Sequence, residues 1–265
     1  GEIIRIAPFG HRAEITIEGP TNTFMKARPN SFATLTVHRD PSESVARFDL
    51  DDQSVVLQEG EWSGWMRASF PLLGALKSAS GIFRLYLKQL RPRFQLYITP
   101  INLDPSQPEL PISTPASYSG DITRELGPFY TQGMAEDTSA LRQGVLSLDE
   151  FIAQTELVLD ESRALFRREL EKFAGGLLFF YFSSVDQNAH MLWGRHDDKL
   201  LKFYRAVDEA VGEAMSKIDD STTLIVMSDH GFTRFDRAVH LNTILMREGF
   251  LALDDPANTG DDELF

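Results

Sequence analysis

Short stretches of alternating apolar and polar residues fill the first hundred positions of the chain. Turn residues such as Glu18-Gly19-Pro20 and Arg39-Asp40-Pro41 separate these stretches. A period of two is typical of strands that bury one face, and clusters of Gly, Pro and Asp are typical of turns. The pattern therefore predicts a β-rich, antiparallel sandwich or barrel-like module over residues 1–100. The predicted strands are Ile3–Ile6, Ala13–Ile17, Ala33–Val37, Val45–Leu50, Ser54–Leu57, Trp62–Phe70, Ile82–Leu87 and Phe94–Ile98.

A proline-rich segment follows at residues 101–120. Pro105, Pro108, Pro111 and Pro115 lie there among Ser and Thr residues, and this composition disfavours a helix. We therefore expect a connector between two structural parts of the chain.

Beyond the connector, apolar residues recur at helical spacing between dense apolar runs. Ser147-Leu-Asp-Glu150 has the pattern of a capping box, which predicts a helix that ends at Gly175-Gly176. Two apolar runs are too dense for half-exposed strands and are predicted to be central parallel strands. The alternation of strands and helices predicts a doubly wound α/β domain over residues 121–265. Its further elements are the strand Leu177–Val185, the helix Asp197–Lys217, the strand Thr222–Met227 and the helix Leu241–Arg247.

Composition narrows the classes of function. The 26 basic and 39 acidic residues give a net charge of −13, which disfavours a nucleic-acid partner because such binders need a cationic surface. No apolar run approaches the roughly 18 residues of a membrane span, and the first residues carry no targeting signal. A start at Gly1 within a strand-like stretch suggests a piece of a longer protein, so the compartment stays open. Without Cys, any metal must be held by His and carboxylate side chains.

Polar residues follow both predicted central strands. Asp186 and His190 come after the first strand, and Asp229 and His230 come directly after the second. In an open α/β sheet, ligands bind beyond the carboxyl ends of the strands. We therefore expect each strand end to deliver one carboxylate and one imidazole to the same edge of the sheet.

These residue types and spacings predict metal binding. Asp186 and His190 are four residues apart, so on a helix they lie on one side and can chelate one cation. Asp229 and His230 are adjacent, and Gly231 permits the sharp turn that would bring both onto one ion. Mixed carboxylate and imidazole ligation suits Zn²⁺, Mn²⁺ or Fe better than Mg²⁺ or Ca²⁺. Two such pairs indicate two metal ions, an arrangement that clamps the attacking and leaving oxygens in phosphoryl transfer.

At this point the chain resembles the type I phosphodiesterase and nucleotide pyrophosphatase family of the alkaline phosphatase superfamily. The likeness covers roughly residues 118 to 253, and the β-rich first hundred residues look like an insertion in the catalytic fold. It is carried by Phe182-Ser-Ser-Val-Asp186-Gln-Asn-Ala-His190-Met-Leu-Trp193, Ser228-Asp-His-Gly-Phe232, Val239-His-Leu-Asn242, Glu248-Gly-Phe-Leu251, and Gly127-Pro-Phe-Tyr-Thr-Gln-Gly-Met134 with Asp137 and Leu141.

The resemblance implies an incomplete, alkaline-phosphatase-like α/β metallohydrolase domain. Asp186 and His190 would bind one divalent ion, and Asp229 and His230 the other, with zinc expected and manganese as the alternative. The substrates would be phosphodiesters or nucleotides with a pyrophosphate bond. The family also has a Thr or Ser nucleophile, a further Asp ligand and a further His ligand, and no residue here matches any of the three. The chain is therefore expected to be inactive by itself.

Other interpretations remain open. A sulfatase or phosphomutase of the same superfamily would share the metal-site plan. A binding module without catalysis would also lack a nucleophile. Taken alone, Asp-x-x-x-His is common on exposed helix surfaces and Asp-His-Gly can form a strand-to-helix turn, but their joint placement favours the metal site. His240 starts a predicted helix and is left out of the ligand set.

Overall fold

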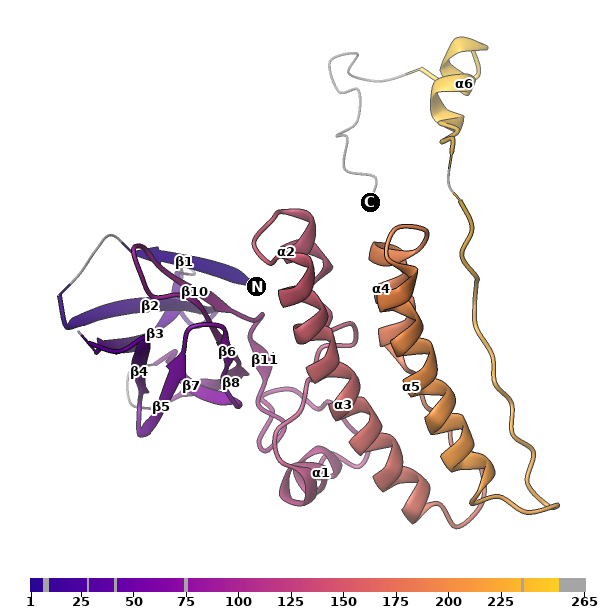
Figure 1. Ribbon diagram of the computed structural model, residues 1–265, viewed down its shortest axis with the longest axis horizontal. Helices are drawn as coiled ribbons and strands as arrows, with labels where there is room; N and C mark the ends of the chain where they lie inside the picture. The colour runs from indigo at the N-terminus through magenta and orange to yellow at the C-terminus, as the bar shows by residue number, and fades with distance from the viewer. Residues whose placement is uncertain (7–9, 28, 41, 74–75, 235, 253–265) are drawn as a thin grey trace. The chain divides into compact units, whose positions relative to one another are not determined.

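The computed structural model describes residues 1–6, 10–27, 29–40, 42–73, 76–234 and 236–252. Its contacts divide it into two compact units, Gly1–Met227 and Ser228–Phe265. The last part of the predicted 121–265 domain, residues 253–265, lies outside the described part of the chain. In the described residues, strands precede helices, and the chain is a mixed α/β protein (Figure 1).

The strands occupy the first part of the larger unit. They are β1 (Glu2–Ile6), β2 (Arg12–Thr21), β3 (Asn30–Arg39), β4 (Val45–Leu50), β5 (Gln53–Gln58), β6 (Glu61–Trp62), β7 (Met66–Pro71), β8 (Ser78–Phe83), β9 (Leu85–Gln89), β10 (Phe94–Ile98) and β11 (Asn102–Leu103). The helices are α1 (Tyr118–Leu126), α2 (Thr138–Arg142), α3 (Leu148–Lys172), α4 (Ser183–Leu192), α5 (Asp197–Met215) and, in the smaller unit, α6 (Leu241–Arg247).

Three sheets share one apolar core. Their strand orders are β1-β10-β9-β6, β11-β8-β7 and β2-β3-β4-β5, and every described pairing is antiparallel. In β2 to β5 and in β7, burial alternates along the strand, as β7 illustrates with Met66, Ala68 and Phe70 buried between exposed neighbours. The antiparallel structure predicted from the alternation is therefore confirmed. The predicted strand Trp62–Phe70 is divided, because Ser63–Trp65 lie between β6 and β7.

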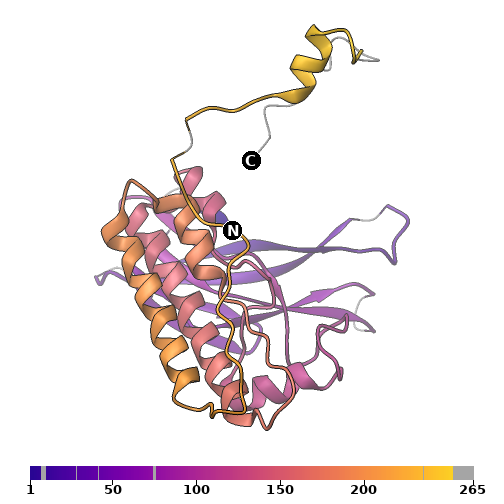
Figure 2. The same ribbon diagram turned by 90° about the vertical axis from the view of Figure 1, so that its right-hand side faces the viewer.

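The long helices form a layer against the sheets. Figures 1 and 2 show α3 and α5 side by side, and α4 packs against α5. A second apolar cluster joins Tyr86 and Tyr97 of the sheets to Phe151 of α3 and Phe203 of α5. No helix in the described part of the chain has the length and apolarity that a membrane span requires.

The start of α3 has the predicted capping box. The Ser147 hydroxyl accepts a hydrogen bond from the Glu150 backbone nitrogen at 3.3 Å, and the Glu150 carboxylate accepts one from the Ser147 nitrogen at 2.6 Å. Glu150 also contacts Lys88 of β9. The same residues therefore begin the helix and hold it against the sheet.

The two predicted parallel strands differ from the structure. Leu177–Phe182 forms no strand in the described residues, and α4 already begins at Ser183, so the predicted strand Leu177–Val185 is wrong for this structure. Thr222–Met227 also forms no strand there. A strand requires a neighbour for its backbone groups, and apolar pattern alone supplies none. The doubly wound sheet is thus not confirmed.

We expect the Ser147 cap to contribute measurably to stability. Ser147→Ala should lower the free energy of unfolding by about 1 kcal/mol, whereas Ser147→Gly should cost only a few tenths, because glycine tolerates the N-cap conformation and leaves the first turn hydrated. Urea unfolding of both variants and the wild type checks this. Equal losses in the two variants would contradict a capping role.

Candidate metal centre

Helix α4 carries the first predicted ligand pair, and buried polar contacts hold its beginning. The N-cap residue, Phe182, offers no side-chain cap. Instead the hydroxyls of Ser183 and Ser184 donate to Glu136 Oε1, at 2.9 and 2.7 Å. These contacts place a carboxylate from a distant segment at the helix N-terminus, and Glu136 is only 4% exposed there. Negative charge there complements the helix dipole.

The opposite turn of α4 is fixed to α3. Asn188 is fully buried, and its side-chain nitrogen donates to the Ser184 carbonyl at 2.8 Å. Its Oδ1 lies 3.2 Å from the Thr155 hydroxyl of α3, which donates the hydrogen bond. Ala189 and Leu192 are buried on the same helix. The buried residues leave Asp186 half-buried and His190 exposed.

The structure brings Asp186 and His190 together. Asp186 Oδ1 lies 3.4 Å from His190 Nε2, and Asp186 Oδ2 accepts a hydrogen bond from the Gln187 amide at 2.9 Å. This is the one-sided placement that the spacing of four residues predicts. A carboxylate oxygen and an imidazole nitrogen at this separation form a donor set that suits a divalent ion of the zinc type.

The second predicted pair lies in the smaller unit. Asp229 and His230 are exposed, and Asp229 Oδ1 accepts from the His230 backbone nitrogen at 3.1 Å. The His230 ring stacks edge-on against Phe232 with ring centres 5.2 Å apart. Gly231 is not among the described glycines with positive φ, so the turn expected there is not of the left-handed kind. A site shared by the two pairs stays a prediction.

Sequence reasoning gave no structural role to a short acidic segment, although Asp137 is among the residues that resemble the family. Asp137 Oδ2 accepts from the Tyr97 hydroxyl of β10 at 2.6 Å, and Asp137 Oδ1 caps α2 through the Ala140 nitrogen at 2.9 Å. The Gly1 amino group also contacts Asp137. Gln154 of α3 accepts from the Asp137 nitrogen at 3.0 Å. Ala135–Asp137, here called the acidic strap, thus binds a strand, two helices and, through Glu136, α4.

Comparison with known proteins identifies the chain at the level of a family. The sequence model of the type I phosphodiesterase / nucleotide pyrophosphatase family matches residues 104–261, which is more than half of the chain. The chain belongs to this family. The recognition made from the motifs is therefore confirmed. Searches of curated proteins and of solved structures returned no match.

All four predicted ligands lie within the match to the phosphodiesterase family. The same match contains the acidic strap, α3 and α4, whereas β1 to β11 precede it. The family indicates hydrolysis of phosphodiester or pyrophosphate bonds. Nothing in the match tests the role of any single residue.

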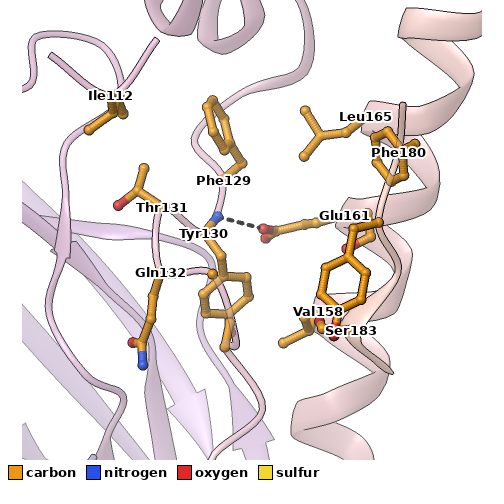
Figure 3. Close-up of a pocket in the computed structure, with 14 residues that line it drawn as sticks. Ile112, Phe129, Tyr130, Thr131, Gln132, Val158, Glu161, Leu165, Phe180 and Ser183 are labelled. Carbon is orange, nitrogen blue, oxygen red and sulfur yellow. Dashed lines mark hydrogen bonds between the residues drawn. The ribbon is translucent and has the colours of Figure 1, made fainter. Parts of the chain in front are cut away.

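A cavity of about 290 Å³ lies beside the acidic strap (Figure 3). Its lining includes Phe129 and Tyr130 on one side and Phe180 on the other, and Figure 3 shows Glu161 reaching from α3 to the Tyr130 nitrogen, 3.1 Å away. Glu161 is the one charged residue in this lining. The described residues of the lining include no cationic side chain, so the cavity offers no charge complement to a negatively charged phosphoester of the kind this family cleaves.

Glu161 instead joins the sheets to α3. It accepts hydrogen bonds from Trp65 at 2.8 Å and from Arg84 at 2.5 Å, and the Arg84 guanidinium lies over the Trp65 ring. Burial raises the pKa of Glu161, and the Arg84 charge opposes that effect. The cavity therefore adjoins a structural ion pair.

Burial also raises the pKa of Glu136. The hydrogen bonds from the Ser184 and Ser183 hydroxyls oppose this rise, whereas the nearby negative charge of Asp186 adds to it. Between the usual value of 4.5 and the raised pKa, the folded state keeps a proton that the unfolded state has released. Stability should therefore fall as pH rises through this window.

We expect Glu136→Gln to remove this contribution, because the amide does not titrate. Urea unfolding from pH 4.5 upward checks it as the difference in slope between wild type and variant. Glu171→Gln, at an exposed position near the end of α3, is the control and should keep the wild-type slope. Identical slopes for Glu136→Gln and wild type would show that Glu136 does not titrate differently on folding.

Proposed function

We propose that this chain supplies part of a two-metal site that hydrolyses phosphodiester or nucleotide pyrophosphate bonds. Asp186 and His190 hold one divalent ion, and Asp229 and His230 hold the other. The observation that supports this most is the close Asp186–His190 pair on a firmly anchored helix, within the stretch matched to the family. Members of the family are generally metal-dependent.

Zinc fits the donor set best, and manganese is the alternative, because carboxylate and imidazole together are less suited to Mg²⁺ or Ca²⁺. When bound, such ions polarise the phosphoryl group and activate the nucleophile. The protein's own part is positional. Asp186 Oδ1 and His190 Nε2 lie 3.4 Å apart on one side of α4, so a single ion can bind both atoms.

The doubly wound sheet is also part of the proposal. Leu178, Phe180 and Phe182 are partly buried, whereas the alternate residues Leu177, Phe179 and Tyr181 are 90%, 74% and 52% exposed. Ile225, Val226 and Met227 are exposed as well. Apolar residues on both faces are typical of central strands in a parallel sheet. We propose that both segments become such strands once neighbouring strands of the full-length protein are present.

The catalytic nucleophile and the remaining ligands lie, in this proposal, outside the chain. The family match favours a phosphodiesterase or nucleotide pyrophosphatase over the sulfatase and phosphomutase alternatives. A non-catalytic binding module is the alternative, and coding sequence that continues beyond this chain, with a Thr or Ser after an upstream strand, would favour the enzyme. The substrates would be phosphate-ester small molecules or nucleotides.

We expect the purified chain to show negligible turnover of a nitrophenyl phosphodiester with zinc or manganese, because no attacking group matches the family's nucleophile. Spectrophotometric release of nitrophenolate measures it. Clear metal-dependent turnover, abolished by a chelator, would show that the chain contains a complete active site and that the proposed division of residues is wrong.

We expect weak zinc binding by the chain, because two ligands per ion leave the other positions to water. His190→Ala should weaken this binding further. Equilibrium dialysis with elemental analysis measures zinc per chain, and His196→Ala, at the N-cap of α5, is the matched histidine control. Equal zinc content in the His190→Ala variant and the control would remove His190 from the ligand set.

In the full-length protein we expect tight metal binding that depends on the same residues. His190→Ala and His230→Ala should each lower metal content and turnover together, by at least the roughly 10- to 100-fold loss typical of changes to residues that only support ligands. Elemental analysis and the phosphodiester assay on both variants check this. Full metal content and full turnover in both would return the four residues to a structural role.

A further inference from the structure

We propose that Glu136 is the positioning residue for the Asp186–His190 ligand pair: it holds the first turn of α4 so that both ligand atoms stay directed to one point. This inference rests on the proposed function. Glu136 matches no ligand motif, and in this proposal it acts on the ligand pair through α4 and does not bind the ion itself.

Among the described residues, the Glu136 carboxylate accepts side-chain hydrogen bonds from two hydroxyl groups and from no cationic side chain. Ser183 Oγ lies 2.9 Å from Oε1 and 3.1 Å from Oε2, and Ser184 Oγ lies 2.7 Å from Oε1. Ser183 and Ser184 are 7% and 1% exposed. Buried polar groups are costly unless paired, so this cluster favours a single arrangement.

The position of these contacts along α4 makes them relevant to the ligands. Ser183 and Ser184 are the first two residues of the helix, and Asp186 follows within the same turn. Since Phe182 provides no side-chain cap, Glu136 is the acidic group that meets the helix N-terminus from outside. If the first turn frays, the Asp186 carboxylate loses its fixed distance from His190.

Glu136 can hold α4 because the acidic strap is itself fixed on both sides. The Gln154 amide donates to the Ala135 carbonyl at 2.9 Å, and Gln154 Oε1 accepts from the Asp137 nitrogen at 3.0 Å. Gln154 is fully buried. The residues before and after Glu136 are therefore tied to one side chain of α3, which leaves the Glu136 carboxylate little freedom to move.

The charge of Glu136 has a second effect on the pair. Glu136 and Asp186 are close enough for their negative charges to repel each other. A cation held by Asp186 would reduce that repulsion, and the carboxylate of Glu136 would in turn favour a cation at this place. Positioning and charge thus act in the same direction.

The first test needs no metal. Amides Gln187–His190 bond to first-turn carbonyls of α4, so their hydrogen exchange reports on that turn. Glu136→Ala, and separately Ser183→Ala combined with Ser184→Ala, should speed their exchange by roughly tenfold relative to amides of α5 in the same molecule. Because α5 is the internal reference, general destabilisation would raise both rates. Equal changes in α4 and α5 would overturn the proposal.

The second test measures zinc binding to the full chain by calorimetry. Glu136→Ala should weaken zinc binding by about tenfold, the lower end of the effect of residues that support ligands, and Glu136→Gln should lie between it and wild type. Glu161→Gln is the control, because Glu161 is a partly buried glutamate that contacts Trp65, Arg84 and Tyr130 instead of α4. This control should bind zinc like the wild type.

Asp186→Ala distinguishes a failure of the positioning role of Glu136 from a failure of the proposed metal site. If Asp186→Ala weakens zinc binding and Glu136→Ala does not, the positioning role of Glu136 is wrong and the metal site stands. If Asp186→Ala leaves zinc binding unchanged, or the wild type binds no zinc, the proposed metal site is wrong and the inference built on it fails with it.

Discussion

The need of buried polar groups for partners governs how this chain is organised. In β1 to β11 the backbone groups pair within antiparallel sheets, and the apolar faces meet in one core. In the acidic strap, hydrogen bonds that involve side chains connect the strap to one strand and three helices and give their polar groups partners. Where no partner strand is present among the described residues, as at Thr222–Met227, an apolar run stays outside any sheet. Hydrophobic content alone does not produce a strand.

This constraint explains what the sequence could predict. Local patterns were sufficient for the alternating strands, for the capping box at Ser147 and for the pairing of Asp186 with His190, since each depends on residues within a few positions. The family was also recognisable, because its motifs are contiguous. The boundary at Ser183 was missed since helix formation there draws on Glu136, which is 47 residues away in the sequence.

The missed residues share a physical cause. Glu136, Asp137 and Gln154 are polar residues whose roles depend on partners far along the chain, and no period or spacing marks such partners. An acidic pair in a loop ordinarily indicates exposure. The pair is buried because Tyr97 and the serines of α4, all distant in the sequence, donate hydrogen bonds to its carboxylates. The one available signal was the resemblance to the family, which included the nearby stretch Gly127–Met134 and Asp137 but gave no role to either.

The acidic strap has a consequence for cooperativity. Its neighbouring carboxylates reach different elements, Asp137 a sheet strand through Tyr97 and Glu136 the start of α4. Tyr97 also lies in the apolar cluster with Phe151 and Phe203, so polar and apolar contacts cross the same boundary. A change from strand-like to helical patterning along a sequence is often taken as a boundary between domains that unfold independently. Here the sheets and α4 share partners through two consecutive residues, and heat should melt them in a single calorimetric transition.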